Sequence, residues 1–158
     1  MWSHFYLGLT YYDSGETDQA IQSLDAASTI EPGHEAPYRW LGYIYLQERQ
    51  YEKALANLHT SLSISPHQRY SWVYLLRAYH ELGLVSELQQ NAVAMISILP
   101  NSSTPYLYLA STLKDGDVCS NFVTLLESMN LSLTELGSLS DEDSEKLRRE
   151  LGICGLLH

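Results

Sequence analysis

The chain has 158 residues, of which 45% are hydrophobic and 18% are charged, a composition that is typical of a folded chain and excludes a disordered tail. Nine Lys and Arg residues against 19 Asp and Glu residues give a net charge of −10. We therefore expect no nucleic acid and no anionic membrane surface as a partner, because both need a basic protein surface. No apolar run reaches the roughly 18 residues of a membrane-spanning helix, and no signal peptide is recognisable, so we expect a cytoplasmic location.

The chain repeats itself with a period of 34 residues. Prolines stand at positions 32, 66 and 100, and this spacing indicates a stack of small units. We divide the chain into units of residues 1–34, 35–68, 69–102 and 103–136, followed by a tail of residues 137–158. Three further sets of positions keep the same period: Leu7, Leu41, Leu75 and Leu109; Tyr11, Tyr45, Tyr79 and Leu113; and Ala20, Ala54, Leu88 and Phe122.

Each unit is predicted to be a pair of helices. Apolar residues recur every three or four positions, which is the period of one helix face, and Gly8 and Gly42 in that face let a second helix approach closely. Gly15 and Gly83 follow first helices, where glycine adopts the left-handed conformation that closes a helix. Second helices end before proline, which lacks an amide donor. The predicted helices span residues 2–14, 18–30, 36–48, 52–64, 70–82, 86–98, 104–114 and 118–130.

Tyrosine is unusually frequent, with 12 residues against two of phenylalanine. Its ring is apolar and its end is polar, so the enrichment favours half-buried surfaces. Repeat position predicts that Tyr11, Tyr45 and Tyr79 pack in the core. A second set with the same period is predicted to pack between helices: Tyr6, Trp40, Tyr74 and Tyr108.

The tail is predicted to hold one more helix. Ser140 provides a cap, acidic residues 141–143 suit the positive first turn, and basic residues 146–149 suit the other end. We interpret this segment as a C-terminal capping helix. Two alternatives are a remnant similar to the last part of a sterile alpha motif domain, and a disordered tail.

The repeated leucine, glycine, tyrosine, alanine and proline positions resemble the tetratricopeptide repeat (TPR) family over residues 1 to about 130. The third unit has Trp72 at the family's tryptophan position, whereas the fourth departs from the pattern, with Thr134 where proline is expected. The resemblance implies an all-α fold, a right-handed α-solenoid of antiparallel helix pairs.

The sequence lacks the motifs of common enzymes. His80-Glu81 has Leu84 where a zinc-protease helix needs a second histidine, and there is no phosphate-binding loop or nucleophile elbow. The acidic segments 115–117 and 141–143 lack the alternating ligands of a calcium loop, and Cys119 and Cys154 stand outside any metal or redox spacing. We therefore expect no enzyme activity, no metal and no cofactor.

The resemblance also implies a peptide-binding groove on the concave side, where first helices of successive units meet. Aromatic residues there would bury apolar groups of a peptide, and arginines would contact its carboxylates or carbonyls. The chaperone-binding members of the family use two lysines, two asparagines and an arginine, and none of these is matched at Phe5, Leu9, Trp40, Tyr70 and Tyr74. The predicted groove residues are Phe5, Leu9, Tyr12, Arg39, Tyr43, Leu46, Tyr70, Val73, Arg77, His80 and Lys114.

The sequence thus predicts a non-catalytic protein–protein interaction module, an adaptor or scaffold that binds a peptide segment of a partner protein. We expect it to be a monomer or to self-associate weakly. Two alternatives stay open: the recruiting domain of a larger enzyme, such as a TPR-bearing transferase, and a secretion or assembly chaperone.

Overall fold

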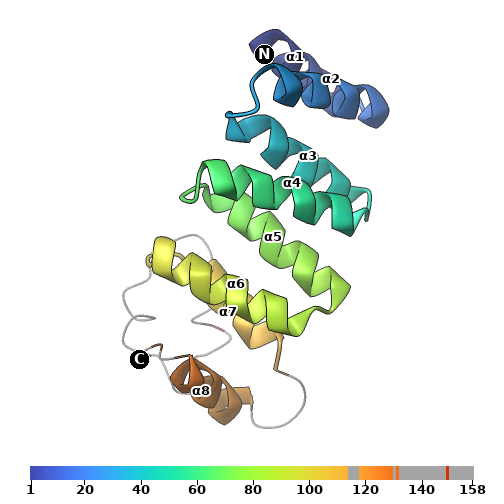
Figure 1. The fold of residues 1–158 in the computed structure, drawn as a ribbon. Helices are drawn as coiled ribbons and strands as arrows, with labels where there is room; N and C mark the ends of the chain where they lie inside the picture. Colours follow the sequence, from blue (N-terminus) through green and yellow to red (C-terminus); the bar gives the residue numbers. More distant parts are fainter. Residues whose placement is uncertain (114–117, 130, 132–148, 150–158) are drawn as a thin grey trace. The chain divides into compact units, whose positions relative to one another are not determined.

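The computed structural model describes residues 1–113, 118–129, 131 and 149, and every regular element in these residues is an α-helix (Figure 1). The chain divides into two compact units, an N-terminal unit (Met1–Leu82) and a C-terminal unit (Gly83–His158). The helices in chain order are α1 (Trp2–Asp13), α2 (Thr17–Ile30), α3 (Glu35–Gln47), α4 (Tyr51–Ile64), α5 (Arg69–Leu82), α6 (Val85–Ile98), α7 (Thr104–Ser111) and α8 (Val118–Ser128).

The helix pattern predicted from the sequence is confirmed. The first six helices begin and end within one residue of the predicted bounds. Helix α7 ends at Ser111, earlier than predicted, because the amides of Thr112 and Leu113 bond the carbonyls three residues back, at 3.1 Å each, and close the helix in a tighter turn. The predicted tail helix lies outside the described residues, apart from Arg149.

The two helices of a pair approach closely at glycine. A Cβ atom added to Gly42 of α3 would lie 2.6 Å from Cγ of Leu58 on α4, and one added to Gly8 of α1 would lie 2.8 Å from Cγ of Leu24 on α2. Both leucines are fully buried. The predicted role of these glycines is therefore confirmed, since any larger residue would push the helices apart.

The turns after α1, α3 and α5 each use a left-handed residue. Gly15 and Gly83 have φ of 80° and 68°, but the equivalent position between α3 and α4 is Arg49, with φ of 58°. The backbone bonds of the first two turns match: Glu16 N–H bonds Tyr11 O and Gln50 N–H bonds Tyr45 O, both at 2.8 Å. The left-handed conformation costs a residue with a Cβ atom about 1 kcal/mol, so Arg49 carries a cost that glycine avoids.

The same repeat position is buried only where a second helix covers it. Leu41 on α3 and Leu75 on α5 are 1% and 0% exposed, because α2 packs on α3 and α4 packs on α5. Leu7 is 43% exposed, since no described helix of the N-terminal unit covers the corresponding face of α1. The prediction that Tyr6 packs between helices is wrong for the same reason, because Tyr6 is 61% exposed.

Of the tyrosines predicted to pack in the core, Tyr79 is buried there and Tyr45 lies at its edge. Tyr79 is 8% exposed, and its hydroxyl lies 2.8 Å from Nε2 of His59 on α4. Tyr45 is half-buried and has the ammonium group of Lys53 over its ring, 5.2 Å from the ring centre. Both rings pack against the fold, and the Tyr79 hydroxyl has a polar partner on a neighbouring helix.

The C-terminal unit has a core of its own. Helix α6 packs on α7, and α7 contacts α8. Between α6 and α7, the Gln89 side chain donates to the hydroxyl of Thr112 at 3.3 Å. Among the described residues of this unit, the buried apolar side chains are Leu88, Ala92, Met95, Ile96, Tyr106, Leu109, Phe122 and Leu126.

Candidate functional site: an aromatic stripe on the first helices

Five aromatic rings form a continuous stripe over α1, α3 and α5 of the N-terminal unit. The ring centres of Tyr12 and Tyr43 are 5.7 Å apart, those of Tyr43 and Tyr74 are 4.9 Å apart, and those of Tyr74 and Tyr70 are 6.3 Å apart. Trp40 lies beside Tyr12 and Tyr43, at 6.1 and 5.7 Å. We call these five residues the aromatic stripe.

Helical spacing explains the stripe. Trp40 and Tyr43 are three residues apart on α3, and Tyr70 and Tyr74 are four apart on α5, so each pair shares one helix face. The contacts of Tyr12 with α3 are edge-to-face, at interplanar angles of 61° and 70°, which is the geometry that aromatic rings prefer. Tyr70 is 60% exposed and the other four rings are half-buried. The stripe is thus an ordered apolar surface that still faces solvent.

Two tyrosine hydroxyls of the stripe, those of Tyr12 and Tyr74, are held in their neutral form. Burial raises the pKa of Tyr12 to about 12, and the hydrogen bond with the Tyr43 side chain and the negative charges of Glu48 and Asp13 act in the same direction. Burial also raises the pKa of Tyr74, although the positive charges of nearby arginines partly oppose this shift. At neutral pH the stripe therefore offers uncharged hydroxyl donors and acceptors along an apolar surface.

The raised pKa of Tyr12 gives a testable pH dependence. Because the folded pKa lies above the ordinary value of 10.0, the contribution of Tyr12 to stability is complete below pH 10 and is lost as the pH rises toward 12. In a titration followed by phenolate absorbance, with circular dichroism to monitor folding, we expect Tyr12→Phe to remove one late-titrating group. Tyr43→Phe removes the hydrogen-bond partner and is expected to make Tyr12 titrate earlier. If the tyrosine that is lost in Tyr12→Phe is one that titrates at lower pH, near the ordinary value, this assignment is contradicted.

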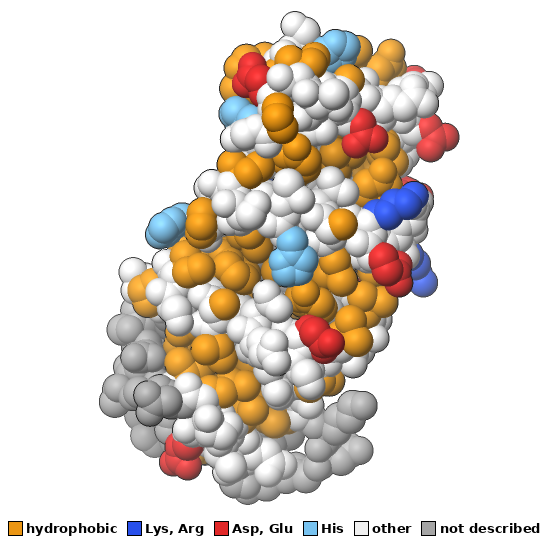
Figure 2. All heavy atoms as spheres, in the orientation of Figure 1, with side chains coloured by type: hydrophobic (Ala, Val, Ile, Leu, Met, Phe, Trp, Pro, Cys, Tyr) orange, Lys and Arg blue, Asp and Glu red, His pale blue; other side chains and the backbone are white. Residues whose placement is uncertain are grey.

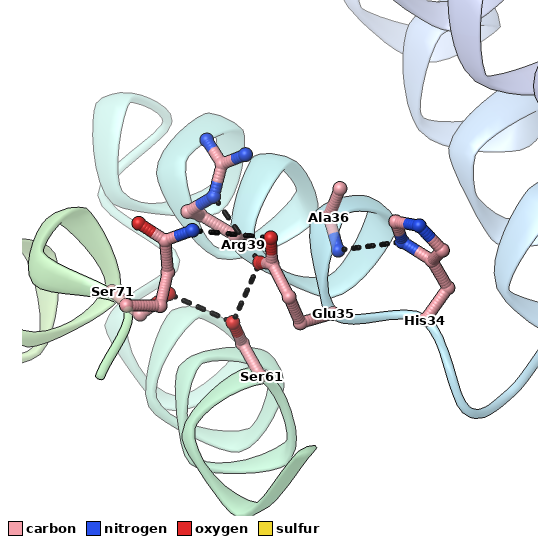
Figure 3. A network of polar contacts seen from close by, with 7 residues as sticks. His34, Glu35, Ala36, Arg39, Ser61 and Ser71 are labelled. Atoms are coloured by element: carbon pink, nitrogen blue, oxygen red, sulfur yellow. Dashed lines mark hydrogen bonds and ion pairs between the residues drawn. The ribbon is translucent and has the colours of Figure 1, made fainter. Parts of the chain in front are cut away.

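Arg39, a predicted groove residue, takes part in a polar network between α3, α4 and α5 (Figure 3). Its Nε donates to Oε2 of Glu35 at 3.3 Å, and the same oxygen accepts a bond from Ser61 at 3.4 Å. Oε1 of Glu35 accepts from the Gln68 amide at 3.1 Å. The hydroxyls of Ser61 and Ser71 are 2.7 Å apart and both residues are buried. Part of the donor capacity of Arg39 is thus used inside the fold.

The remaining predicted groove residues differ in their exposure. Phe5 and Leu46 are 6% and 3% exposed, because their side chains turn toward the core, where Phe5 packs with Ala20 and Leu24. Leu9 and Val73 are half-buried, whereas Arg77 and His80 are exposed. Lys114 lies outside the described residues. Conversely, Trp40 and Tyr74 were predicted from the sequence only as packing residues, but the structure places them in the stripe.

A polar hollow of about 220 Å³ lies next to the turn between α3 and α4. Arg49 is the turn residue in the left-handed conformation, and Arg77 and Glu81 reach the hollow from α5. Leu46 and Arg77 of its lining are among the predicted groove residues. The signal that could have revealed it is the arginine at a repeat position held by glycine in two other units. The complete lining is Leu46, Gln47, Arg49, Tyr51, Arg77 and Glu81.

Two features are absent from the described residues. No group of three or more His, Cys, Asp or Glu side chains there is placed to hold a metal ion. Among the helices in this part of the chain, none combines the length and the apolar character needed to cross a membrane.

Comparison with known proteins agrees with this architecture. Residues 11–56 match the sequence profile of the tetratricopeptide repeat. The second TPR domain of human RPAP3, solved in complex with an HSP70 peptide, is 16% identical, with 72% of this chain and 94% of that chain covered and a TM-score of 0.64. MamA of AMB-1 is 19% identical, with coverages of 80% and 69% and a TM-score of 0.66. A thermophilic TPR protein of Thermus thermophilus is 16% identical, with coverages of 98% and 84% and a TM-score of 0.60.

At these identities the solved structures establish the fold, and no curated protein matches the chain in sequence. The fold defines an all-α solenoid of helical hairpins. Residues 11–56 are thus of the tetratricopeptide repeat type, and the 34-residue period extends the same pattern along the chain.

Proposed function

We propose that this chain is a non-catalytic protein–protein interaction module that binds a peptide segment of a partner protein along the aromatic stripe. The observation that carries the proposal is the unbroken run of rings from Tyr12 on α1 to Tyr70 on α5. Tyrosine and tryptophan provide large contact areas with little loss of side-chain entropy, and they dominate the energy of many interfaces. The RPAP3 domain, which shares the fold, was solved with a bound peptide.

The dimensions of the stripe suit a short extended segment. Packed helices lie about 8–10 Å apart, so the path from α1 across α3 to α5 is on the order of 16–20 Å. An extended chain advances about 3.3 Å per residue, so roughly five or six residues would cover the stripe. A peptide of this length could bury apolar side chains between the rings and bond their hydroxyls.

The chemistry of the stripe favours apolar, aromatic or proline side chains in the ligand. At the positions where chaperone-binding relatives hold a terminal carboxylate, this chain has the rings of Trp40, Tyr70 and Tyr74, together with Phe5 and Leu9. These residues offer no cation, so the stripe itself would not select a C-terminal carboxylate. We infer that it recognises an internal segment of its partner.

The test uses peptides selected from a random phage-displayed library against the intact chain. We expect the double variant Tyr43→Ala, Tyr70→Ala to bind the selected peptides at least about tenfold more weakly, since truncation of a central aromatic anchor typically costs more than 1 kcal/mol. Ile30→Ala removes a side chain that is 53% exposed on α2 and serves as the matched control. Circular dichroism confirms that each variant folds.

Two results would contradict the proposal: selected peptides that bind the double variant as tightly as the parent, or a selection that yields no peptide. We further propose a cytoplasmic location and a monomer or weakly self-associating state. Light scattering on the intact chain measures the latter directly.

A further inference from the structure

The polar hollow beside the α3–α4 turn is a locally positive site on an acidic protein. Arg49 and Arg77 bring two guanidinium groups to it, and Glu81 brings one carboxylate, whereas the chain as a whole carries a charge of −10. On the face seen in Figure 2, Lys and Arg side chains lie at one edge of the molecule, with Asp and Glu side chains beside them. The local excess of positive charge would attract an anion.

The donors of the two arginines are available. Within the described residues, neither Arg49 nor Arg77 forms an ion pair or a side-chain hydrogen bond, in contrast to Arg39, whose Nε bonds Glu35. A guanidinium group has five N–H donors in a fixed plane, which match the oxygen atoms of a carboxylate or a phosphate. Gln47, which carries a side-chain amide, and Tyr51, which carries a hydroxyl, also line the hollow. The hollow therefore has the donors, and the volume, for one oxyanion.

The backbone at Arg49 supports a role for its side chain. The equivalent residues of two other turns are Gly15 and Gly83, which adopt the left-handed conformation without strain. An arginine in that conformation is strained, and residues held in such conformations occur preferentially at functional sites. The turn itself needs only glycine, so the arginine is best explained by what its guanidinium group does in the hollow.

We propose that the Arg49–Arg77 hollow binds an anionic side chain, a carboxylate or a phosphate, of the peptide that occupies the aromatic stripe. This inference rests on the proposed function and adds the charge of the ligand to it. The hollow and the stripe are linked through α5, where Arg77 follows Tyr74 by three residues and so shares its helix face. The site is distinct from the carboxylate-binding positions of the chaperone-binding relatives, which are apolar here.

The first experiment tests the anion site alone, without a peptide. The Nε–Hε resonances of the intact, isotope-labelled chain are followed by NMR while inorganic phosphate, or acetate, replaces sodium chloride at constant ionic strength. We expect saturable shifts of both Arg49 and Arg77, whereas the other arginines do not saturate. Saturation by both anions indicates a general oxyanion site, and saturation by phosphate alone indicates a phosphorylated side chain. Shifts that stay linear, or that chloride reproduces, would overturn the proposal.

Three variants sharpen the result. Arg77→Gln and Arg49→Gly are each expected to weaken binding of the oxyanion about tenfold, as loss of a charge-assisted hydrogen bond does. Arg49→Gly is also expected to raise the Tm by a few degrees, because it relieves the strained turn. Lys53→Gln makes the same change in charge on α4 outside the hollow and is expected to bind as the parent does. If all three variants bound phosphate as tightly as the parent does, the proposal would be overturned.

The second experiment links the site to the peptide. We expect the peptides selected against the intact chain to contain an acidic residue whose replacement by alanine weakens binding about tenfold to the parent but little to Arg77→Gln. If the acidic residue matters equally to both proteins, the hollow does not receive it. If the anion shifts saturate but no peptide depends on Tyr43 and Tyr70, the proposed peptide function fails while the anion site stands.

Discussion

Replacement of Leu58 by alanine is expected to lower the free energy of unfolding of the N-terminal unit by about 2–5 kcal/mol. The Leu58 side chain is 0% exposed and packs against the backbone of α3 at Gly42. Its truncation loses the burial of an isopropyl group and leaves a cavity that a glycine on the opposite helix cannot fill. Urea unfolding followed by circular dichroism measures the loss, and a change smaller than about 1 kcal/mol would show that this contact does not hold the hairpin together.

The partner of this contact gives a second arm of the same prediction. Gly42→Ala places a Cβ atom 2.6 Å from Cγ and 2.7 Å from Cδ2 of Leu58, so we expect overpacking to cost about 1–3 kcal/mol. Alanine favours a helix over glycine by up to about 1 kcal/mol, which offsets part of this cost. In the double variant, Leu58→Ala leaves room for the new methyl group. We therefore expect the double variant to lose less stability than the two single variants lose together.

A control separates packing from helix propensity. Ala56 is exposed within α4, so Ala56→Gly measures the propensity difference without a packing term. It is expected to destabilise the unit by about 1 kcal/mol. If Gly42→Ala instead stabilises the protein by the amount that Ala56→Gly costs, then α3 and α4 move apart without penalty and the close approach has no energetic role.

The fold could be predicted from the sequence because its signals are local and repeated. Proline, glycine and the spacing of apolar residues fix where each helix begins and ends, and the period of 34 residues repeats these signals. The exposure of individual side chains was harder to predict from the sequence. Leu7 occupies the repeat position of Leu41 and Leu75 but is 43% exposed, because burial depends on the helix that covers a position. The repeat position of a residue can be read from the sequence, whereas the helix that covers this residue is known only from the folded structure.

The candidate site could be predicted only in part for the same physical reason. Tyr12, Tyr43 and Tyr70 were expected on the first helices, but repeat position could not show whether the rings of Trp40 and Tyr74 lie in the core or at its surface. For polar groups, only pairs that are close in sequence are visible. Glu35 and Arg39 have the four-residue spacing of a helical ion pair. The bonds of Glu35 to Ser61 and Gln68 join residues 26 and 33 positions apart, which no local pattern indicates.

Replacement of Glu35 by alanine is expected to lower the free energy of unfolding by about 2–3 kcal/mol. The Glu35 carboxylate accepts bonds from Arg39 on α3, Ser61 on α4 and Gln68 directly before α5, and its removal leaves these three donors without this acceptor. Hydrogen bonds to a charged group contribute about 1.5–3 kcal/mol each when buried. The Glu35 side chain is 17% exposed, so solvent screens part of its charge and water can replace some of its hydrogen bonds. The expected loss is therefore smaller than the sum of three buried hydrogen bonds to a charged group.

The matched control for this prediction is Glu52→Ala. Glu52 is also the acidic residue in the first turn of its helix, so both variants lose the same favourable interaction with the helix dipole, about 0.3–1 kcal/mol. Glu52 is exposed, and its loss leaves the Glu35 network intact. The excess cost of Glu35→Ala over Glu52→Ala, measured by urea unfolding, is therefore the contribution of the network. Glu35→Gln keeps acceptor oxygen but not charge and should recover part of that excess. Equal costs for the two alanine variants would show that the network does not join α3, α4 and α5.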